Sequence, residues 1–404
     1  MSKNLKLFFE ASLCDLASFE YTAWQQKLVR LPKPSFETHQ PDLDALRVIL
    51  QDAEQFGNII IIGNGGSRTS ALAFFDSLSA FRNNKRVAFL STMEPEVIAE
   101  LRANCAPHNT LVMPISKSGT NVDVLEPLLQ FLDYPIIPVT SPEKGVLYDL
   151  AKIYNWPIIS HPEVGGRFSG RTECGLAPAY LFGLNIESLN QGAIKAYTAF
   201  NYAAPLAAND AFLAALICYQ HERLGIDQIF MPIYSRALSG FLPLIIQLIH
   251  ESTGKLGLGQ TIFGDQAPES QHHTNQRFFG GPRNVLGFFM TVKNHAPHIV
   301  TKVPAKIKTL SLREGTLADL DGIPLYTALH FDYAGVAEEA TKNNIPHLTL
   351  EVNEVTPESM GELLSFWHFF AVYSAFLREQ DPFDQPEVEA AKDISFKKRQ
   401  QFKR

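Results

Sequence analysis

The chain has 404 residues, of which 46% are hydrophobic and 19% charged, a balance that predicts folded domains with ordinary cores. The formal net charge of −7 argues against a nucleic-acid partner and against an anionic membrane surface. Apolar stretches such as FLPLIIQLI (241–249) are too short to span a membrane. The four cysteines are far apart in sequence, so we expect reduced thiols and a cytoplasmic protein, without a zinc site or a disulfide framework.

The first half of the chain alternates between helical and strand-like patterns. Residues 1–40 predict a helix and a connector, and an amphipathic helical pattern follows at 42–56. A run of four isoleucines predicts a buried strand at 58–62. Further strands are expected at 86–90, 110–115, 135–140 and 156–160, with helices between most of them. This alternation predicts a parallel sheet that is covered by helices on both faces.

The second half repeats the same design after a long helical region at 175–224. Strands are expected at 228–233, 285–292 and 346–352, and helices at 237–252 and around 335–343. The strongly apolar stretch at 360–380 predicts one more long helix. The sequence therefore predicts an α/β fold of two doubly wound units with mainly parallel sheets, plus helices at the N- and C-terminal ends.

Two loops with polar tips follow expected strands, in IIIIGNGGSRTSA (59–71) and LVMPISKSGTN (111–121). Ligands of a parallel sheet gather at the carboxyl ends of its strands. Glycines let backbone N–H groups approach an anion, a following helix N-terminus adds positive potential, and Ser116, Ser118 and Thr120 add hydroxyl donors. Neither loop is a Walker motif or a complete dinucleotide fingerprint. One such loop alone would be only a tight turn, but the pair predicts a monophosphate site that fits a sugar phosphate better than a nucleotide.

IGNGGS and SKSGT resemble the sugar isomerase (SIS) domain, and specifically the phosphoglucose isomerase family, which has two such domains in tandem. Four more segments resemble motifs of that family in the same order: VGGRFS (164–169), QLIHESTGK (247–255), QHHTNQ (271–276) and FDQPEVEAAK (383–392). The resemblance covers about residues 58–392. It implies an N-terminal helical segment at 1–40, a first SIS domain with the phosphate site at 41–200, a second SIS domain with the catalytic base at 201–355, and a C-terminal helical segment at 356–404.

The resemblance implies an aldose–ketose isomerase that interconverts glucose 6-phosphate and fructose 6-phosphate through a cis-enediol, with neither cofactor nor metal. Glu251, at the end of an apolar helix, would be the base that moves the proton. Arg167 would stabilise the enediolate with a fixed positive charge. Viewed alone, Glu251 could be a solvated glutamate and Arg167 a surface arginine, whereas Arg171 is the better candidate for a structural role.

Ring opening would fall to His272, with Lys392 on the ring oxygen or a hydroxyl. His273 is a rival for His272, and an exposed helix lysine is the alternative for Lys392. In the family the histidine comes from the partner subunit, which implies a homodimer.

Gln247 and Gln385 match two glutamines of the family that contact substrate. The expected phosphate-binding residues are Gly66, Ser67, Ser116, Lys117, Ser118, Thr120 and Asn121.

Two positions depart from the family pattern. Asn121 stands where a phosphate-binding threonine is usual, although its amide can still donate a hydrogen bond. His250 lies beside the base and could act on its charge if it were protonated and faced inward.

Three alternatives to this function remain open. They are an isomerase with broader specificity, such as mannose 6-phosphate; a sugar-phosphate sensor without catalysis; and an aminosugar isomerase or synthase of the same fold. The first 40 residues are too short and too weakly basic for the DNA-binding helix-turn-helix that usually accompanies a sensor. The aminosugar enzymes lack the pair GGRFS and FDQ…K.

Overall fold

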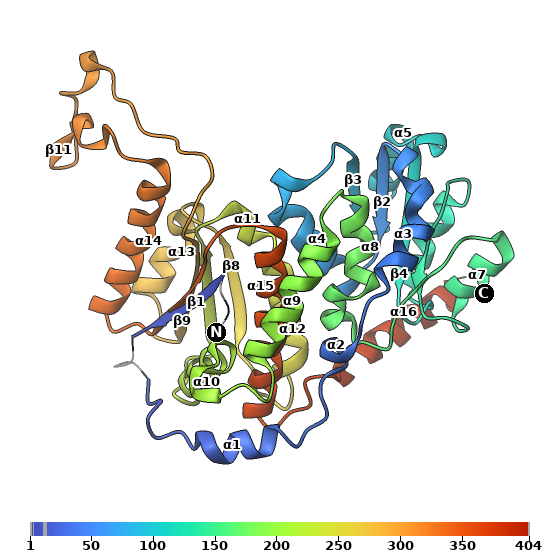
Figure 1. Ribbon diagram of the computed structural model, residues 1–404, viewed down its shortest axis with the longest axis horizontal. Coiled ribbons are helices and arrows are strands. Elements are labelled where there is room, and N and C mark those ends of the chain that lie inside the picture. Colours follow the sequence, from blue (N-terminus) through green and yellow to red (C-terminus); the bar gives the residue numbers. More distant parts are fainter. Residues whose placement is uncertain (1, 3, 11–13, 403–404) are drawn as a thin grey trace.

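The computed structural model describes residues 2, 4–10 and 14–402, which form two five-stranded sheets flanked by helices (Figure 1). The first sheet contains β2 (Asn58–Ile62), β3 (Arg86–Leu90), β4 (Thr110–Ser116), β5 (Val139–Thr140) and β6 (Ile159–Ser160). The second contains β1 (Leu5–Phe9), β7 (Gln228–Ile233), β8 (Thr261–Gln266), β9 (Val285–Val292) and β12 (His347–Val352). A separate hairpin pairs β10 (Ser311–Leu312) with β11 (Gly315–Thr316).

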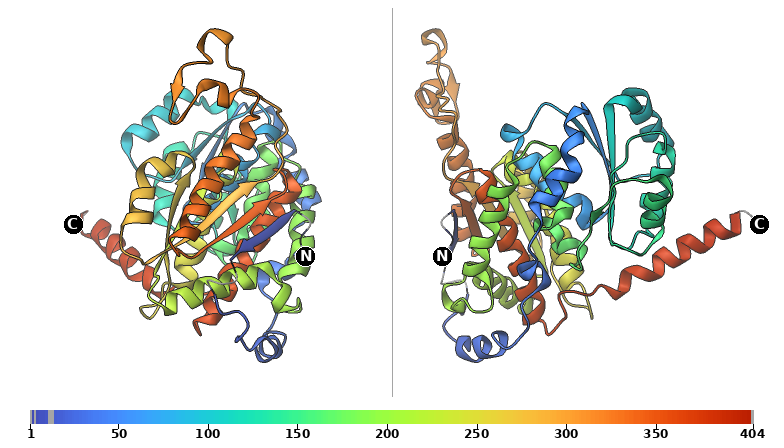
Figure 2. Two further views of the ribbon diagram at one scale, coloured as in Figure 1. Left: turned by 90° about the vertical axis from the view of Figure 1, so that its left-hand side faces the viewer. Right: turned by 45° about the vertical axis from the view of Figure 1, so that its right-hand side comes forward.

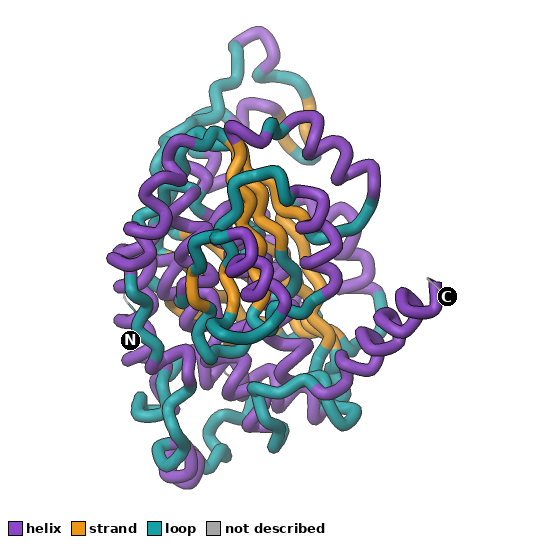
Figure 3. The backbone as a smooth tube through the Cα atoms, turned by 90° about the vertical axis from the view of Figure 1, so that its right-hand side faces the viewer, coloured by secondary structure: helices purple, strands orange, loops and turns teal. Residues whose placement is uncertain are grey.

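The first sheet is parallel throughout, in the order β3-β2-β4-β5-β6. The isoleucines of β2 are buried because helices cover both faces of this sheet, as Figure 3 also shows. The chain passes from β2 outward to β3 and then returns to the other side of β2 as β4. Strand order therefore reverses between β2 and β4, and this reversal point is where open α/β sheets bind their ligands.

The second sheet has the order β1-β12-β9-β7-β8, and it is parallel except for β1. The prediction of a helical segment at 1–40 is wrong for Leu5–Phe9, which pair antiparallel with β12. The physical reason is alternation, because Leu5 and Leu7 are buried while Lys6 and Phe8 are exposed. The N-terminal segment thus adds an edge strand to the sheet built by the second half of the chain.

The helices form a middle layer between the sheets and outer layers beyond them (Figures 1 and 2). The longer helices of the first half are α1 (Tyr21–Leu28), α3 (Leu43–Leu50), α4 (Gly66–Ser77), α5 (Pro95–Asn104), α6 (Val122–Leu128), α7 (Val146–Tyr154), α8 (Glu173–Leu181) and α9 (Ile186–Phe200). Those of the second half are α10 (Asp210–Arg223), α12 (Leu242–Thr253), α13 (Glu269–Gly280), α14 (Leu325–Lys342), α15 (Pro357–Leu377) and α16 (Glu389–Phe402). Two short helices, α2 (Ser35–Thr38) and α11 (Arg236–Ser239), complete the set.

Helix α15 runs through the centre of the molecule and is the main element of the core. It packs against α9, α10 and α12, and Trp367 near its middle is fully buried. Its N-terminus is closed by Thr356, whose hydroxyl accepts the N–H of Ser359 at 3.2 Å. A helix that is apolar on all sides must be surrounded by others, so this sequence pattern places α15 between the two sheets.

The predicted α/β fold class is confirmed, with two differences in strand length that have a physical cause. β5 and β6 are limited to two residues each, where strands at 135–140 and 156–160 were expected. Pro135, Pro138 and Pro157 lack the N–H that a ladder requires, which shortens both strands. β8 was not predicted at all, since its sequence TIFGDQ carries only two strongly apolar side chains.

Two segments extend from the body of the molecule. Residues 293–324, which include β10 and β11, project beyond α14, and α16 leads away from the second sheet (Figure 2). The residues of α16 are exposed except for Arg399, which is partly buried and forms an ion pair with Glu126 of α6 at 2.7 Å. Across the described residues, no helix is both long enough and apolar enough to cross a membrane.

Candidate active site

The two loops expected to hold a phosphate lie side by side at the carboxyl edge of the first sheet. They follow neighbouring strands, since Ile62 of β2 pairs with Pro114 of β4. The Nδ2 of Asn64 donates to the Oδ2 of Asp123 at 2.9 Å and links the first loop to the start of α6, the helix that follows the second loop. Both loops therefore flank the reversal point of strand order, where an anion can meet groups from each.

Within the second loop, hydrogen bonds between neighbouring polar groups define the turn. Ser116 is buried, and its Oγ accepts the N–H of Gly119 at 3.2 Å. Thr120 donates its hydroxyl to the Oγ of Ser118 at 3.0 Å, and Ser118 donates to the Oδ1 of Asn121 at 3.3 Å. The amide oxygen of Asn121 thus belongs to the turn, and its amide nitrogen remains the group that could donate to an anion.

The first loop ends at Gly66, where helix α4 begins. Gly65 has a φ of 57°, a left-handed conformation that glycine adopts without strain. Ser67 is buried in the first turn, where the unpaired N–H groups of a helix favour an anion. A Cβ on Gly66 would lie 2.0 Å from the carbonyl oxygen of Gly166, so the two glycine-rich segments touch backbone to backbone.

Replacing Gly66 by alanine is expected to destabilise the protein by about 1–3 kcal/mol, because the added methyl group would overlap rigid backbone atoms. Gly166→Ala is the matched control, since a Cβ at Gly166 meets no atom within 4 Å. Thermal unfolding of the two variants checks the prediction. Equal stability of both would contradict the close contact between the segments.

Gln247 connects helix α4 to the predicted base. It lies on α12, one turn before Glu251, and its Nε2 donates to the Oε1 of Glu251 at 3.0 Å. Its Oε1 accepts the hydroxyl of Thr69 on α4 at 2.9 Å. Because both ends of the amide are engaged, Gln247 holds the carboxylate of Glu251 at a fixed position relative to the first turn of α4. The side chain of Glu251 keeps 31% of its surface exposed, so a ligand can reach it.

Arg167 lies on the other side of the same carboxylate. It belongs to the 3₁₀ helix η6 (Gly166–Arg171), and only 3% of its surface is exposed. One Nη1 contact joins it to the Oε2 of Glu251 at 3.1 Å, and a second joins it to the Oε1 of Gln385 at 2.6 Å. Its Nε donates to the Oγ of Ser252 at 2.9 Å. Burial lowers the pKa of Arg167, while the negative charge of Glu251 opposes that shift.

The remaining bonds of Arg167 go to the segment 381–385, which follows helix α15. Its Nη2 donates to the carbonyl oxygen of Pro382 at 2.5 Å and to that of Asp384 at 3.0 Å. The rigid fork of a guanidinium can serve acceptors in several directions at once, which a lysine cannot do. Arg167 thus joins three distant parts of the chain: η6, the end of α12 and the segment after α15.

Arg171 has the structural role expected of it. It is buried, donates to the Oδ1 of Asn190 at 2.9 Å, and donates to the backbone carbonyls of Phe36, Glu37 and His39. These bonds fasten α2 and the first residue after it to η6. Nothing in this set of contacts faces Glu251.

His250 does not act on Glu251 as a charged neighbour. Its Nε2 accepts the backbone N–H of Ile262 in β8 at 2.9 Å, which requires a neutral imidazole at that nitrogen. Burial also lowers the pKa of His250. The alternative that a protonated His250 faces the base is therefore wrong, because the residue serves as an acceptor for the second sheet.

Lys117 forms an ion pair away from the loop tip. Its Nζ lies 3.0 Å from the Oε2 of Glu163, and the Oε1 of the same carboxylate accepts from Lys144 at 2.9 Å. Hydrogen bonds from Lys144 and then Lys117 lower the pKa of Glu163 to about 2. A phosphate that recruits Lys117 would have to compete with this carboxylate, so its phosphate-binding role stays a prediction.

His272 and Lys392 are not brought to the cluster of Arg167 and Glu251. His272 is exposed on α13, where the neighbouring His273 contacts the hydroxyl of Thr274 at 2.6 Å. Lys392 is exposed on α16 and pairs with Glu389 at 2.8 Å. In the part of the chain that the structure describes, no group of three or more histidine, cysteine or acidic side chains is placed to hold a metal ion. The roles of both residues remain predictions.

Sequence reasoning missed several members of the cluster. Ser252 lies inside the quoted segment QLIHESTGK, so its position beside Glu251 was a usable signal. Thr69 is one helical turn from the glycine loop, but only the tertiary contact with Gln247 reveals it. The carbonyl groups of Pro382 and Asp384 carry no side-chain signal, because any residue supplies them.

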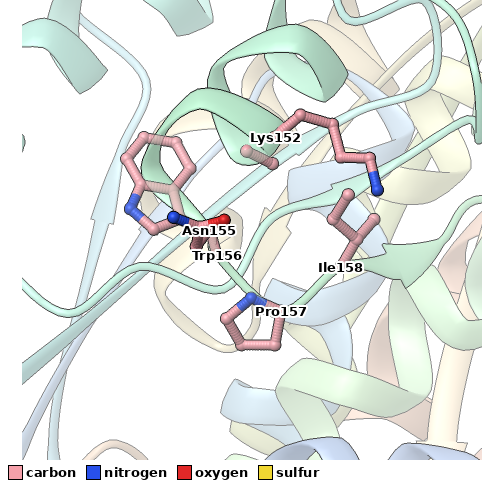
Figure 4. Close-up of a pocket in the computed structure, with 6 residues that line it drawn as sticks. Lys152, Asn155, Trp156, Pro157 and Ile158 are labelled. Carbon is pink, nitrogen blue, oxygen red and sulfur yellow. The ribbon is translucent and has the colours of Figure 1, made fainter.

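A shallow hollow also lies at the end of α7, just before the segment VGGRFS in the sequence. It has a volume of about 540 Å³ and is lined by Ala151, Lys152, Asn155, Trp156, Pro157 and Ile158 (Figure 4). None of the residues predicted from the motifs lines it. The hollow therefore adds nothing to the cluster around Glu251.

Comparison with known proteins supplies the family of this chain. The family model described as phosphoglucose isomerase matches residues 157–404, which include η6, α12 and the segment 381–385. A glucose-6-phosphate isomerase of Thermus thermophilus is 30% identical over 361 residues, covering 84% of this chain and 83% of the relative. A probable glucose-6-phosphate isomerase of Methanococcus maripaludis is 27% identical over 370 residues, covering 88% of this chain and 81% of the relative.

Solved structures share the fold along nearly the whole chain. A hypothetical protein of Thermus thermophilus has a TM-score of 0.85 at 25% identity, covering 97% of this chain and 99% of its own. A glucose-6-phosphate isomerase of Chlamydia trachomatis has a TM-score of 0.73 at 20% identity, covering 93% of this chain and 77% of its own. With the motif cluster assembled around Glu251 and a family model that matches more than half of the chain, the protein belongs to the phosphoglucose isomerase family.

Proposed function

We propose that the protein is a cytoplasmic glucose-6-phosphate isomerase, which interconverts glucose 6-phosphate and fructose 6-phosphate without a cofactor. The observation that supports this most directly is the chain of contacts from Thr69 through Gln247 and Glu251 to Arg167. It fixes a carboxylate and a buried cation at a set position relative to the N-terminus of α4. A substrate with a phosphate at one end and a carbonyl at the other needs this arrangement.

In the proposed reaction, the phosphate binds at Gly66 and Ser67 of the first loop and at Ser116, Ser118 and Thr120 of the second. Asn121 and Lys117 complete the set of phosphate ligands. Their contribution is positioning, because a fixed phosphate places the sugar carbons next to the base and converts a bimolecular encounter into a local one.

Glu251 then removes the proton from the carbon that carries the hydroxyl, which gives a cis-enediolate, and returns it to the adjacent former carbonyl carbon. The hydroxyl proton passes to the former carbonyl oxygen, so that the two carbons exchange their oxidation levels. Arg167 stabilises the negative oxygen that forms. Its Nη1 is the nitrogen that faces both Glu251 and Gln385, so we place the enediolate oxygens beside Nη1. Gln247 keeps the carboxylate aimed during both proton transfers.

His272 and Lys392 open and close the sugar ring in this proposal, with His272 supplied by a second copy of the chain. The exposure of His272 supports this arrangement, since a residue donated across an interface must lie on the surface of its own subunit. Each active site of the homodimer would then need both copies.

A mixing experiment tests the shared site. Glu251→Gln and His272→Ala should each be inactive as homodimers, but mixing and subunit exchange should restore about a quarter of the wild-type activity, because one site of each hybrid dimer is intact. Hybrids that form yet show no recovered turnover would contradict donation across the interface.

Turnover itself separates the proposed function from its alternatives. Purified protein is incubated with fructose 6-phosphate, and formation of glucose 6-phosphate is followed with a coupled dehydrogenase. Turnover supports the proposal, and parallel assays with mannose 6-phosphate measure breadth of specificity. Saturable binding of fructose 6-phosphate without turnover would favour the sugar-phosphate sensor and end the proposal.

A further inference from the structure

Lys255 is a buried lysine four residues after the base, and the proposed reaction gives it no role. Only 7% of its surface is exposed, although the turn that holds it lies at the end of α12, next to the exposed Leu256. A buried ammonium group is costly unless acceptors surround it. The acceptors of Lys255 therefore indicate what the residue does.

Both partners of the Lys255 ammonium belong to one segment. Its Nζ donates to the carbonyl oxygen of Asp381 and to the Oδ1 of Asp384, in short contacts. The backbone of Lys255 is bonded to the same region, since its carbonyl oxygen accepts the Nε2 of Gln380 at 2.8 Å. Lys255 and Arg167 thus both hold the segment 381–385 by hydrogen bonds, Lys255 at Asp381 and Asp384 and Arg167 at the carbonyls of 382 and 384.

The segment has little apolar packing to hold it in place. Asp381, Phe383 and Asp384 are exposed, and Pro382 is its only fully buried member. The ring of Phe383 still contacts Phe168, at 5.5 Å between centroids. Hydrogen bonds to buried cations must therefore supply most of the restraint, and charge-assisted bonds are the strong ones.

The position of this segment decides where Gln385 lies. Gln385 is its last residue, and its Oε1 reaches the same Nη1 of Arg167 that contacts Glu251. We infer that Lys255 is a positioning residue: by holding residues 381–384, it keeps Gln385 on Arg167 beside Glu251. Lys255 itself forms no bond with Glu251 or Gln385 among the described contacts, so it acts through the segment. This inference rests on the proposed function.

The first test is Lys255→Met, which keeps the length of the side chain and removes its charge and donors. Misplacement of a group beside the reacting atoms costs up to about 10²-fold in rate, so we expect kcat to fall by about 10- to 100-fold. Lys255→Arg, which keeps a charged donor, should recover part of that loss. Hydrogen–deuterium exchange should accelerate in peptides covering 380–388 of Lys255→Met and change little elsewhere.

Lys85→Met is the matched control. Lys85 also donates to backbone carbonyls, those of Ala53, Glu54 and Phe56, but it lies beside β3 and outside the cluster. The Lys85→Met variant should be less stable than wild type. Hydrogen–deuterium exchange at 380–388 should not accelerate in it, and its kcat per folded molecule should not fall. A structural role alone would make Lys255→Met behave in the same way.

A double variant separates positioning from direct action. If Lys255 works through Gln385, the double variant Lys255→Met/Gln385→Ala should have a kcat close to that of Gln385→Ala alone. Its total fall in kcat should then be much smaller than the product of the two single falls. Three results would each overturn the inference. They are a fall in kcat of the double variant equal to the product of the single falls, unchanged hydrogen–deuterium exchange at 380–388 in Lys255→Met, and faster exchange there with an unchanged kcat. A wild-type protein without turnover would instead refute the proposed function, and the exchange measurement would still decide whether Lys255 holds the segment.

Discussion

Replacing Glu251 by glutamine is expected to lower isomerase turnover by about 10³- to 10⁴-fold, because general base catalysis contributes up to that much and an amide cannot accept the proton. The change is nearly isosteric. Gln247 and Arg167 both donate to the carboxylate of Glu251, whereas a glutamine at 251 has only one oxygen to accept from them. Its amide nitrogen will then face the other donor, so one hydrogen bond of the cluster is lost. The side chain is partly exposed, which limits the effect on folding.

The measurement is kcat and KM for fructose 6-phosphate, together with the thermal unfolding midpoint. KM should change little, since the phosphate loops are untouched. Glu338→Gln, at an exposed position of α14, is the control for loss of one carboxylate and should behave as wild type. Turnover within tenfold of wild type in Glu251→Gln would remove Glu251 from its role as the base.

Replacing Arg167 by lysine is expected to cost both turnover and stability, although the positive charge is kept. The guanidinium serves five acceptors in different directions: the side chains of Ser252, Glu251 and Gln385 and the carbonyls of Pro382 and Asp384. A lysine ammonium has three donors at one point and cannot reach them all. We expect a fall of about 10²- to 10³-fold in kcat, comparable to losing one donor to a developing oxyanion.

The stability loss follows from the acceptors that are left without donors. Each buried acceptor without a partner costs about 1–3 kcal/mol, so we expect a clear drop in the unfolding midpoint. Arg171→Lys is a closely matched control, because Arg171 is also buried in η6 and also donates to backbone carbonyls. It should lose stability while keeping turnover per folded molecule. Normal turnover in Arg167→Lys would show that charge alone is sufficient.

The predicted effects share one structural origin. Gly66 on α4, Arg167 on η6, Glu251 on α12 and the segment 381–385 are far apart in sequence and meet because α4, α12 and η6 pack against one another. Rigid helices and a 3₁₀ turn carry most of these groups, so small shifts at one member displace the others. This explains why a backbone contact at Gly66 and a buried lysine at 255 are both expected to matter.

The sequence by itself determined the alternation of strands and helices and the α/β class, and it named four of the residues that the structure brings into contact around Glu251. Periodicity sufficed for β2, β4, β7 and β9, because buried parallel strands are continuous apolar runs with clear ends. The motifs also pointed to Arg167, Glu251, Gln247 and Gln385, and the structure joins these four side chains by hydrogen bonds; their catalytic roles stay predictions. By contrast, β1 was predicted as part of a helical segment, since a five-residue pattern is too short to reveal its partner strand.

Only the tertiary structure decided which groups touch. Several contacts join residues more than 100 positions apart: Thr69 with Gln247, Arg167 with the carbonyls of 382 and 384, and Lys255 with Asp384. Local propensity carries no information about such pairs. The tertiary structure also placed His250 against the backbone of β8, where its Nε2 accepts the N–H of Ile262. Residue type sets what a side chain can donate or accept, whereas packing of distant elements sets where its partner lies.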